Sequence, residues 1–150
     1  MREVVSAKVI KLLDASIIYP ISNSKWVGPI HVVPKQAGLT VVKNTDNKLV
    51  LTHIQSGWRV CIDYRNLNAI TRKDHIPHPF IDQMVEHLVG HGYYYFLDGY
   101  YGYNQVLLLP KDQQKTTFIC PSRTFAYHRM PFGLYNAPTT FSTVHDQYLF

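Results

Sequence analysis

The chain has 150 residues, a hydrophobic fraction of 46% and a formal net charge of +5. This length and composition suit one globular domain, or a piece of a larger one, and exclude a disordered chain. The positive charge favours an anionic partner such as nucleic acid.

The sequence shows neither a signal peptide nor a run long and apolar enough to span a membrane. We therefore expect no membrane partner and an intracellular location, cytoplasmic or nuclear. Two cysteines, Cys61 and Cys120, lie in separate apolar runs and form no CxxC unit. We expect both to be buried and reduced, and a zinc site is not indicated.

The first part of the chain predicts a helix, a strand and a hairpin. Apolar residues at helical spacing predict an amphipathic helix over residues 3–15. A short strand is expected at 30–35, where flanking prolines favour a sheet edge. Turn-forming residues divide the segment 36–57 into short β-prone runs, and a long hairpin is the simplest interpretation.

The segment 58–65 alternates apolar and polar residues, which is typical of a strand with one buried face. Arg59, Asp63 and Arg65 then share the polar face. Two interpretations stay open at this point. The row is either a solvated face with an ion pair of little energetic weight, or it directs an arginine at a phosphate or a nucleobase.

The second half predicts a helix over 81–88, because apolar residues recur there at helical spacing before two glycines. Strands are expected at 93–98 and 106–109. A hairpin follows over 116–130, and a last helix opens at Pro138. A helix followed directly by a strand favours an α+β or α/β layer arrangement.

Asp98 ends the apolar, aromatic run of the predicted strand at 93–98. A carboxylate in this position is costly unless a partner neutralises it. A divalent metal such as Mg²⁺ is one such partner, because it takes oxygen ligands. The alternative is that Asp98 only caps a turn before Gly99, and on spacing alone this is the simpler interpretation.

Four ordered segments resemble reverse transcriptases, and in particular the polymerases of gypsy-type long-terminal-repeat retrotransposons. Together they are more specific than a single Asp-Gly pair, so the resemblance favours the metal-ligand interpretation of Asp98. The segments are WVGPIHVVPK at 26–35, WRVCIDYRNLN at 58–68, FLDGYYGYNQ at 96–105 and MPFGLYNAPTTF at 130–141.

The resemblance implies an α+β fold, the right-hand polymerase fold, with a fingers subdomain and an incomplete palm. The implied fingers are about 1–72 and 106–136, and the implied start of the palm is about 74–105 and 137–150. The implied reaction is that of an RNA-directed DNA polymerase, in which two Mg²⁺ ions assist transfer of a dNTP to a primer. Implied partners are an RNA/DNA primer-template, dNTP and the rest of a polyprotein with palm, thumb and RNase H regions.

The resemblance also implies roles for individual residues. Asp98 matches the catalytic aspartate that binds metal, and Tyr103 matches the aromatic residue that excludes a ribose 2′-hydroxyl. Arg59 and Lys35 match fingers residues that contact the incoming nucleotide. The implied dNTP-binding set is Arg59, Gly99, Tyr100, Tyr101, Gly102, Tyr103, Phe132 and Lys35, and the implied template pocket is Gly133, Asn136 and Pro138.

The chain also departs from the family pattern. The family takes its other metal-binding carboxylates from a Tyr-x-Asp-Asp hairpin, and this motif does not occur in the 150 residues. We therefore expect this polypeptide to be inactive on its own, and the alternative function is that of a non-catalytic, nucleic-acid-binding relic. Ser16 stands where the family has a helix-ending glycine, and Tyr101 replaces a small residue.

Overall fold

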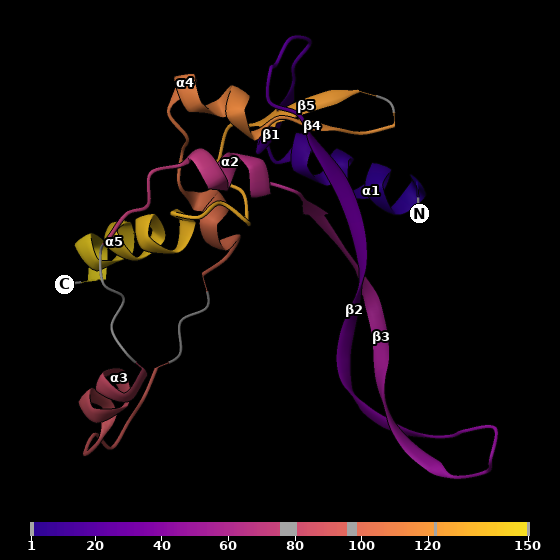
Figure 1. Cartoon of the computed structure of the whole chain (residues 1–150). Helices are drawn as coiled ribbons and strands as arrows, with labels where there is room; N and C mark the ends of the chain where they lie inside the picture. Colours follow the sequence, from indigo (N-terminus) through magenta and orange to yellow (C-terminus); the bar gives the residue numbers. More distant parts are fainter. Residues whose placement is uncertain (1, 76–80, 96–98, 122, 150) are drawn as a thin grey trace.

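The structure, a computed structural model, describes residues 2–75, 81–95, 99–121 and 123–149. Helices and short strands form a body, from which a long two-stranded hairpin projects (Figure 1). The helices are α1 (Arg2–Asp14), α2 (Arg65–Ile70), α3 (Ile81–Leu88), α4 (Pro110–Gln113) and α5 (Ala137–Leu149), with the 3-10 helices η1 (Gly102–Gln105) and η2 (Gln114–Thr116). The strands are β1 (Ile18–Pro20), β2 (Gly28–Lys43), β3 (Leu49–Ile62), β4 (Phe118–Ile119) and β5 (Thr124–Tyr127).

The described strands form one sheet in the order β1-β5-β4-β2-β3. β4 runs parallel to β2, and the other neighbouring strands are antiparallel. β2 meets β4 only through Gly28 and Pro29. Among the described strands, the rest of β2 therefore has β3 as its partner on one side only, as the flanking prolines predicted.

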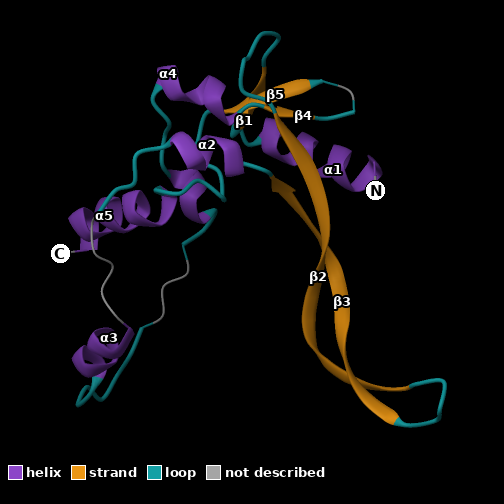
Figure 2. Ribbon diagram, in the orientation of Figure 1, coloured by secondary structure: helices purple, strands orange, loops and turns teal. Residues whose placement is uncertain are grey.

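The hairpin expected over 36–57 is present and longer than predicted, because β2 and β3 pair along their whole length. Two shifts of register lie between Lys35 and Leu39, and Gly38 has a φ of 65° there. Such irregularities increase the local twist of a ribbon. The hairpin is visibly twisted along its length (Figure 2).

The core of the body lies between α1 and the sheet. The predicted helix at 3–15 is confirmed as α1, and its buried residues recur at the predicted helical spacing. Burial of each such side chain stabilises the fold by about 1.5–3 kcal/mol. The buried cluster comprises Val5, Val9, Leu12, Ile17, Ile18, Phe118, Cys120, Phe125 and Tyr127.

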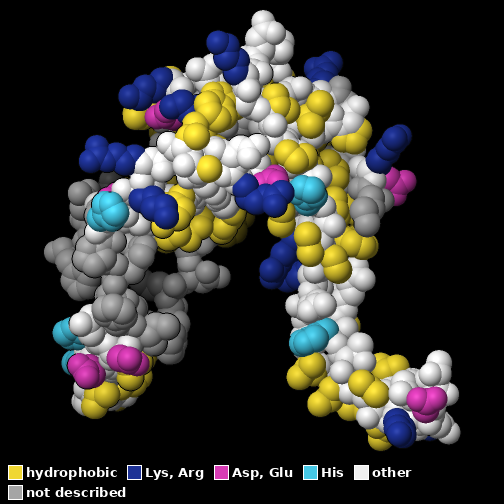
Figure 3. Space-filling model, in the orientation of Figure 1, with side chains coloured by type: hydrophobic (Ala, Val, Ile, Leu, Met, Phe, Trp, Pro, Cys, Tyr) yellow, Lys and Arg dark blue, Asp and Glu magenta, His cyan; other side chains and the backbone are white. Residues whose placement is uncertain are grey.

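The far half of the hairpin exposes apolar side chains. Leu39, Leu49 and Leu51 are 60%, 70% and 67% exposed, and hydrophobic surface appears toward the tip in Figure 3. A two-stranded ribbon has no second layer that could cover its faces. Cys61 is exposed for the same reason, which corrects its expected burial, whereas Cys120 is buried as expected.

The strand expected at 106–109 is wrong. The segment forms a single bridge, between Leu107 and Arg129, and its next residue begins a helix at Pro110. Proline has no N–H to donate to a ladder and fits the first turn of a helix, so the apolar run ends before it can pair further.

Two other strand predictions differ in extent. The alternating segment 58–65 ends as a strand at Ile62, and Arg65 begins α2, a short helix that was not predicted. Residues 93–95 are not in a strand, and 96–98 lie outside the described residues. The predicted helices at 81–88 and from Pro138 are confirmed as α3 and α5.

α1 ends in a Schellman turn at Ser16. The Ser16 N–H donates to the Leu13 carbonyl at 2.8 Å, and the Ile17 N–H donates to the Leu12 carbonyl at 2.9 Å. Ser16 has a φ of 52°, in the left-handed region that favours glycine. The backbone therefore keeps the conformation of the helix-ending glycine that the resemblance implied at this position.

Replacing Ser16 by glycine is expected to raise the free energy of unfolding by roughly 0.5–1 kcal/mol, because a Cβ is unfavourable at positive φ. Urea denaturation measures the change. The control is Ser6→Gly on the exposed face of the same helix, which should lower the free energy of unfolding by about 0.5 kcal/mol. A Ser16→Gly chain that is no more stable than the wild type would contradict the strain at this turn.

Candidate functional site

A tight turn carries several of the predicted site residues. The Gly102 N–H donates to the Gly99 carbonyl at 2.9 Å, and Gln105 Nε2 donates to the Tyr100 carbonyl at 2.6 Å. Tyr101 has a φ of 63°, which is uncommon for a bulky residue and costs about 1–3 kcal/mol. Glycine, which has no Cβ, would relieve this strain.

Tyr103 joins this turn to a distant loop. It lies in η1, and its ring centroid is 4.8 Å from that of Phe132 and 5.4 Å from that of Phe141. These are ordinary distances for stabilising aromatic pairs. The glycines of the turn pack beside the same rings, since a Cβ on Gly102 would lie 3.4 Å from the Phe132 ring and one on Gly99 would lie 3.4 Å from the Phe141 ring.

Arg129 holds the end of η1. Its Nη1 donates to the carbonyls of Asn104 and Gln105 at 3.4 and 3.2 Å. These carbonyls lie at the C-terminus of η1, where a cation interacts favourably with the helix. The bridge from Leu107 to Arg129 fixes the chain on either side. Arg129 was not predicted as a site residue, because its contacts lie about 24 residues away along the chain.

The loop that carries Phe132 is attached to α2. Asn68 Nδ2 donates to the Gly133 carbonyl at 2.8 Å, and the Tyr135 N–H donates to Asn68 Oδ1 at 2.9 Å. Gly133 has a φ of 97°, and a Cβ there would lie 3.5 Å from the Tyr64 ring. The positive φ therefore favours glycine at this turn, while the distance to the Tyr64 ring is that of an ordinary van der Waals contact.

Tyr64 connects this loop to the body. The side chain is buried, and its hydroxyl donates to the Thr116 carbonyl at 3.1 Å. Burial raises the pKa of Tyr64 well above its usual value, so the phenol stays protonated and able to donate.

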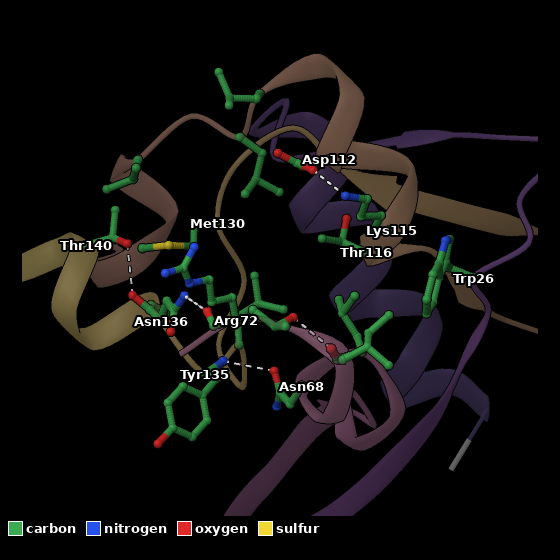
Figure 4. Close-up of a pocket in the computed structure, with 18 of the residues that line it drawn as sticks. Trp26, Asn68, Arg72, Asp112, Lys115, Thr116, Met130, Tyr135, Asn136 and Thr140 are labelled. Carbon is green, nitrogen blue, oxygen red and sulfur yellow. Dashed lines mark hydrogen bonds and ion pairs between the residues drawn. The ribbon is translucent and has the colours of Figure 1, made fainter. Parts of the chain in front are cut away.

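Asn136 makes a second attachment near the start of α5. Its Nδ2 donates to the Arg72 carbonyl at 3.0 Å, and its Oδ1 accepts from the Asp74 N–H at 3.2 Å. A cavity of about 560 Å³ lies beside it, between α2, the segment after η1 and the start of α5 (Figure 4). Pro138 is exposed in the first turn of α5. Of the predicted pocket residues, Asn136 lines this cavity itself, and Gly133 adjoins it through Leu134.

Lys35 and Arg59 lie on one face of the hairpin, in the half nearer the body. Lys35 is opposite Gly57, and Arg59 is opposite Val33. Directly opposed residues and alternate residues share a face, so both cations point the same way. The other face carries Ile30, Val32 and Ile62, which pack against the core. Both cations are exposed, and basic side chains gather near the hairpin base in Figure 3.

Asp63 and Arg65 form an ion pair, which was one of the two interpretations that the sequence left open. Arg65 Nη2 lies 2.6 Å from Asp63 Oδ2, and Arg65 Nε also donates to the carboxylate. These hydrogen bonds lower the pKa of Asp63 from 3.8 to about 2. Arg65 is therefore engaged by a carboxylate, whereas Arg59 forms no ion pair within the described residues. Of the two arginines, Arg59 is the one available to an anion.

Asp98 lies outside the described residues. Across the parts of the chain that the structure describes, no three His, Cys, Asp or Glu side chains come close enough to hold a metal ion. The described residues therefore do not fit a two-metal centre by themselves. The same residues contain no helix long and apolar enough to cross a membrane.

Residues 41–150 match the family described as "Reverse transcriptase (RNA-dependent DNA polymerase)". The chain belongs to the reverse transcriptase family. The resemblance found in the four sequence segments is thereby confirmed, and so is the assignment to the polymerases of long-terminal-repeat retrotransposons.

Relatives of this reverse transcriptase chain include polyproteins of transposons. It is 36% identical over 137 residues to the "Retrovirus-related Pol polyprotein from transposon 297" of Drosophila melanogaster, and 33% identical over 145 residues to that of transposon gypsy. The aligned parts cover 91% and 97% of this chain, but only 12% and 13% of those polyproteins. It is also 37% identical over 92 residues to an "RNA-directed DNA polymerase homolog" of Oenothera berteroana, covering 61% of this chain and 65% of that protein.

Solved reverse transcriptase structures share the fold. The foamy viral protease-reverse transcriptase in complex with RNA/DNA hybrid matches with a TM-score of 0.70 and 18% identity. The match covers 99% of this chain and 18% of that one. The same viral protein in complex with double-stranded DNA matches with a TM-score of 0.59 and 18% identity, over 99% of this chain and 22% of that one. The predicted polymerase-type α+β fold is thereby confirmed.

The Asp63–Arg65 pair predicts a specific titration. In Arg65→Met the pKa of Asp63 should rise from about 2 toward 3.8, because the hydrogen bonds that stabilise the carboxylate are lost. An NMR titration of the Asp63 carboxyl carbon measures it, and Arg72→Met is the matched control. Since the folded pKa is the lower one, the contribution to stability is present above about pH 4 and is lost as pH falls toward 2. An Asp63 pKa that is unchanged in Arg65→Met would refute the assignment.

Proposed function

We propose that the chain is the part of a reverse transcriptase domain that receives the incoming dNTP and the template-primer during RNA-directed DNA synthesis. The observation that carries the proposal is the contact between Tyr103 and Phe132, whose ring centroids are 4.8 Å apart. This contact joins two of the segments that carry the resemblance to the family, 96–105 and 130–141. One of these segments also carries Asp98.

In this proposal the turn and the hairpin contact different parts of the nucleotide. Arg59 and Lys35 lie on one exposed face and supply positive charge for the triphosphate. The backbone between Gly99 and Gly102 approaches the triphosphate, since small residues allow close contact, with Tyr100 and Tyr101 beside it. Tyr103 lies against the sugar and rejects a 2′-hydroxyl.

The template strand and the subdomains follow from the same proposal. Phe132 stacks near the nascent base pair, and Gly133, Asn136 and Pro138 line the template side. Residues of about 1–72 and 106–136 form the fingers, while about 74–105 and 137–150 begin the palm. The remaining palm, thumb and RNase H regions are the proposed partners within a polyprotein. The transposon polyproteins that this chain resembles are far longer than the chain.

Asp98 has the chemistry of a magnesium ligand, because Mg²⁺ prefers carboxylate oxygens. When bound, two such ions would stabilise the attacking and leaving oxygens of the transfer. Holding both ions requires carboxylates in addition to Asp98. The Tyr-x-Asp-Asp motif that would supply them does not occur in the 150 residues.

The purified 150-residue polypeptide should therefore incorporate no dTTP on poly(rA)/oligo(dT) in Mg²⁺, because one carboxylate cannot hold two ions in line. Incorporation of radiolabelled dTTP is the measurement, with a retroviral reverse transcriptase as the positive control. Incorporation that Asp98→Asn abolishes would refute this expectation, since the site would then be complete without the missing motif.

Nucleic-acid binding tests the proposal directly. The chain should bind an RNA/DNA hybrid without sequence preference, and affinity should fall as salt rises. Arg59→Ala and Lys35→Ala should each weaken binding and reduce the salt slope by about one, because each removes about one charge contact. Fluorescence anisotropy measures both quantities, and Lys8→Ala on exposed α1 is the control.

Two outcomes separate the candidate functions. If added dNTP and the Tyr103→Ala substitution both change the affinity for the hybrid, the result supports the nucleotide site. Salt-dependent binding that is indifferent to dNTP supports a non-catalytic nucleic-acid-binding relic. Affinity that does not change between low and moderate salt contradicts both.

A further inference from the structure

Asn68 uses both ends of its side-chain amide on one short loop. Its Nδ2 donates to the Gly133 carbonyl at 2.8 Å, and its Oδ1 accepts from the Tyr135 N–H at 2.9 Å. The loop and the residue lie side by side in the close-up, where the bond to Tyr135 is drawn (Figure 4). The bonded positions are 65 and 67 residues away from Asn68 in the sequence.

The two bonds fix the backbone directly after Phe132. Within the described ranges, the Gly133 carbonyl and the Tyr135 N–H have no hydrogen-bond partner other than Asn68. Gly133 has a φ of 97°, so an unattached loop would have a wide choice of conformations. The direction of the Phe132 ring depends on this backbone. Phe132 is 62% exposed, so burial contributes little to holding it.

The helix itself does not need the Asn68 side chain. The Asn68 N–H donates to the Tyr64 carbonyl at 2.8 Å, and the Thr71 N–H donates to the Leu67 carbonyl at 3.1 Å. Asn66 lies on the same helix and is exposed, and no side-chain hydrogen bond ties it to the loop in the described structure. The two asparagines thus differ in their contacts and not in residue type.

We propose that Asn68 is a positioning residue that holds Phe132 against Tyr103 and thereby sets the selectivity of the nucleotide site for deoxyribose over ribose. The selectivity part rests on the proposed function. Asn68 acts through the loop backbone, to which its two hydrogen bonds are made. Because Phe132 supports one side of the Tyr103 ring, a shift of Phe132 would let that ring yield to a 2′-hydroxyl.

The test compares Asn68→Asp with Asn66→Asp in the full 150-residue chain. Both variants add one negative charge to α2, but only Asn68→Asp replaces the donor to the Gly133 carbonyl by an oxygen that repels it. The first readout is the nuclear Overhauser effect between the Tyr103 and Phe132 rings. It should be lost in Asn68→Asp and kept in Asn66→Asp, while the effect between Phe118 and Phe125 in the core persists in both. Asn68→Ala repeats the test without a charge.

The second readout is the ratio of the dissociation constants of ATP and dATP, from NMR titrations with Mg²⁺. Asn68→Asp should lower this ratio by about threefold to tenfold, the equivalent of one ordinary hydrogen bond, and Asn66→Asp should leave it unchanged. A ring contact that survives in Asn68→Asp and Asn68→Ala overturns the positioning role. A lost contact with an unchanged ratio overturns the role in selectivity. A wild-type chain that binds neither nucleotide defeats the proposed function, and the ring contact still decides the positioning role.

Discussion

The buried phenol of Tyr64 is the constraint on which the arrangement of this molecule depends. It follows the end of β3 and precedes α2, its hydroxyl bonds the Thr116 carbonyl, and its ring lies against Gly133. Three segments far apart in the sequence therefore meet at one side chain. A buried hydroxyl that lost its partner would cost about 1–3 kcal/mol, so this junction favours one relative placement of hairpin, helix and loop.

Helical spacing and turn residues made much of the fold predictable. The errors lie in short segments, where the local pattern did not show the structure that forms. α1 and α3 follow from helical spacing, and the hairpin follows from turn residues between β-prone runs. α2 was missed because its six residues are too few to show helical periodicity and its first residue, Arg65, ends the alternating segment. A strand was wrongly expected at 106–109 because four apolar residues precede Pro110. At the second place Pro110 decides the conformation, because proline has no N–H to donate to a ladder and fits the first turn of a helix.

The candidate site was predictable only through family resemblance, because its geometry consists of long-range contacts. Spacing alone favoured a turn cap at Asp98, and nothing local relates Tyr103 to Phe132, which lies 4.8 Å away between ring centroids. Asn68 stands inside a segment that carried the resemblance, yet no property of the segment reveals its bonds to a loop 65 residues further along. A hydrogen bond from a side chain to a distant backbone atom leaves no recognisable pattern in the sequence.

The hairpin pairs with the rest of the sheet only at its base, so a small rotation there is amplified at its tip. β2 contacts β4 only at Gly28 and Pro29, and the 14 residues of β3 extend about 45 Å at ~3.3 Å per residue. A rotation of about 5° at the base would carry the tip through roughly 4 Å. Lys35 lies six residues from Pro29, about 20 Å at ~3.3 Å per residue, and Arg59 is opposite Val33, four residues from Pro29. Both cations would therefore move less than half as far as the tip. A rotation at the base would thus carry the apolar end of the ribbon through a wider arc than these two cations.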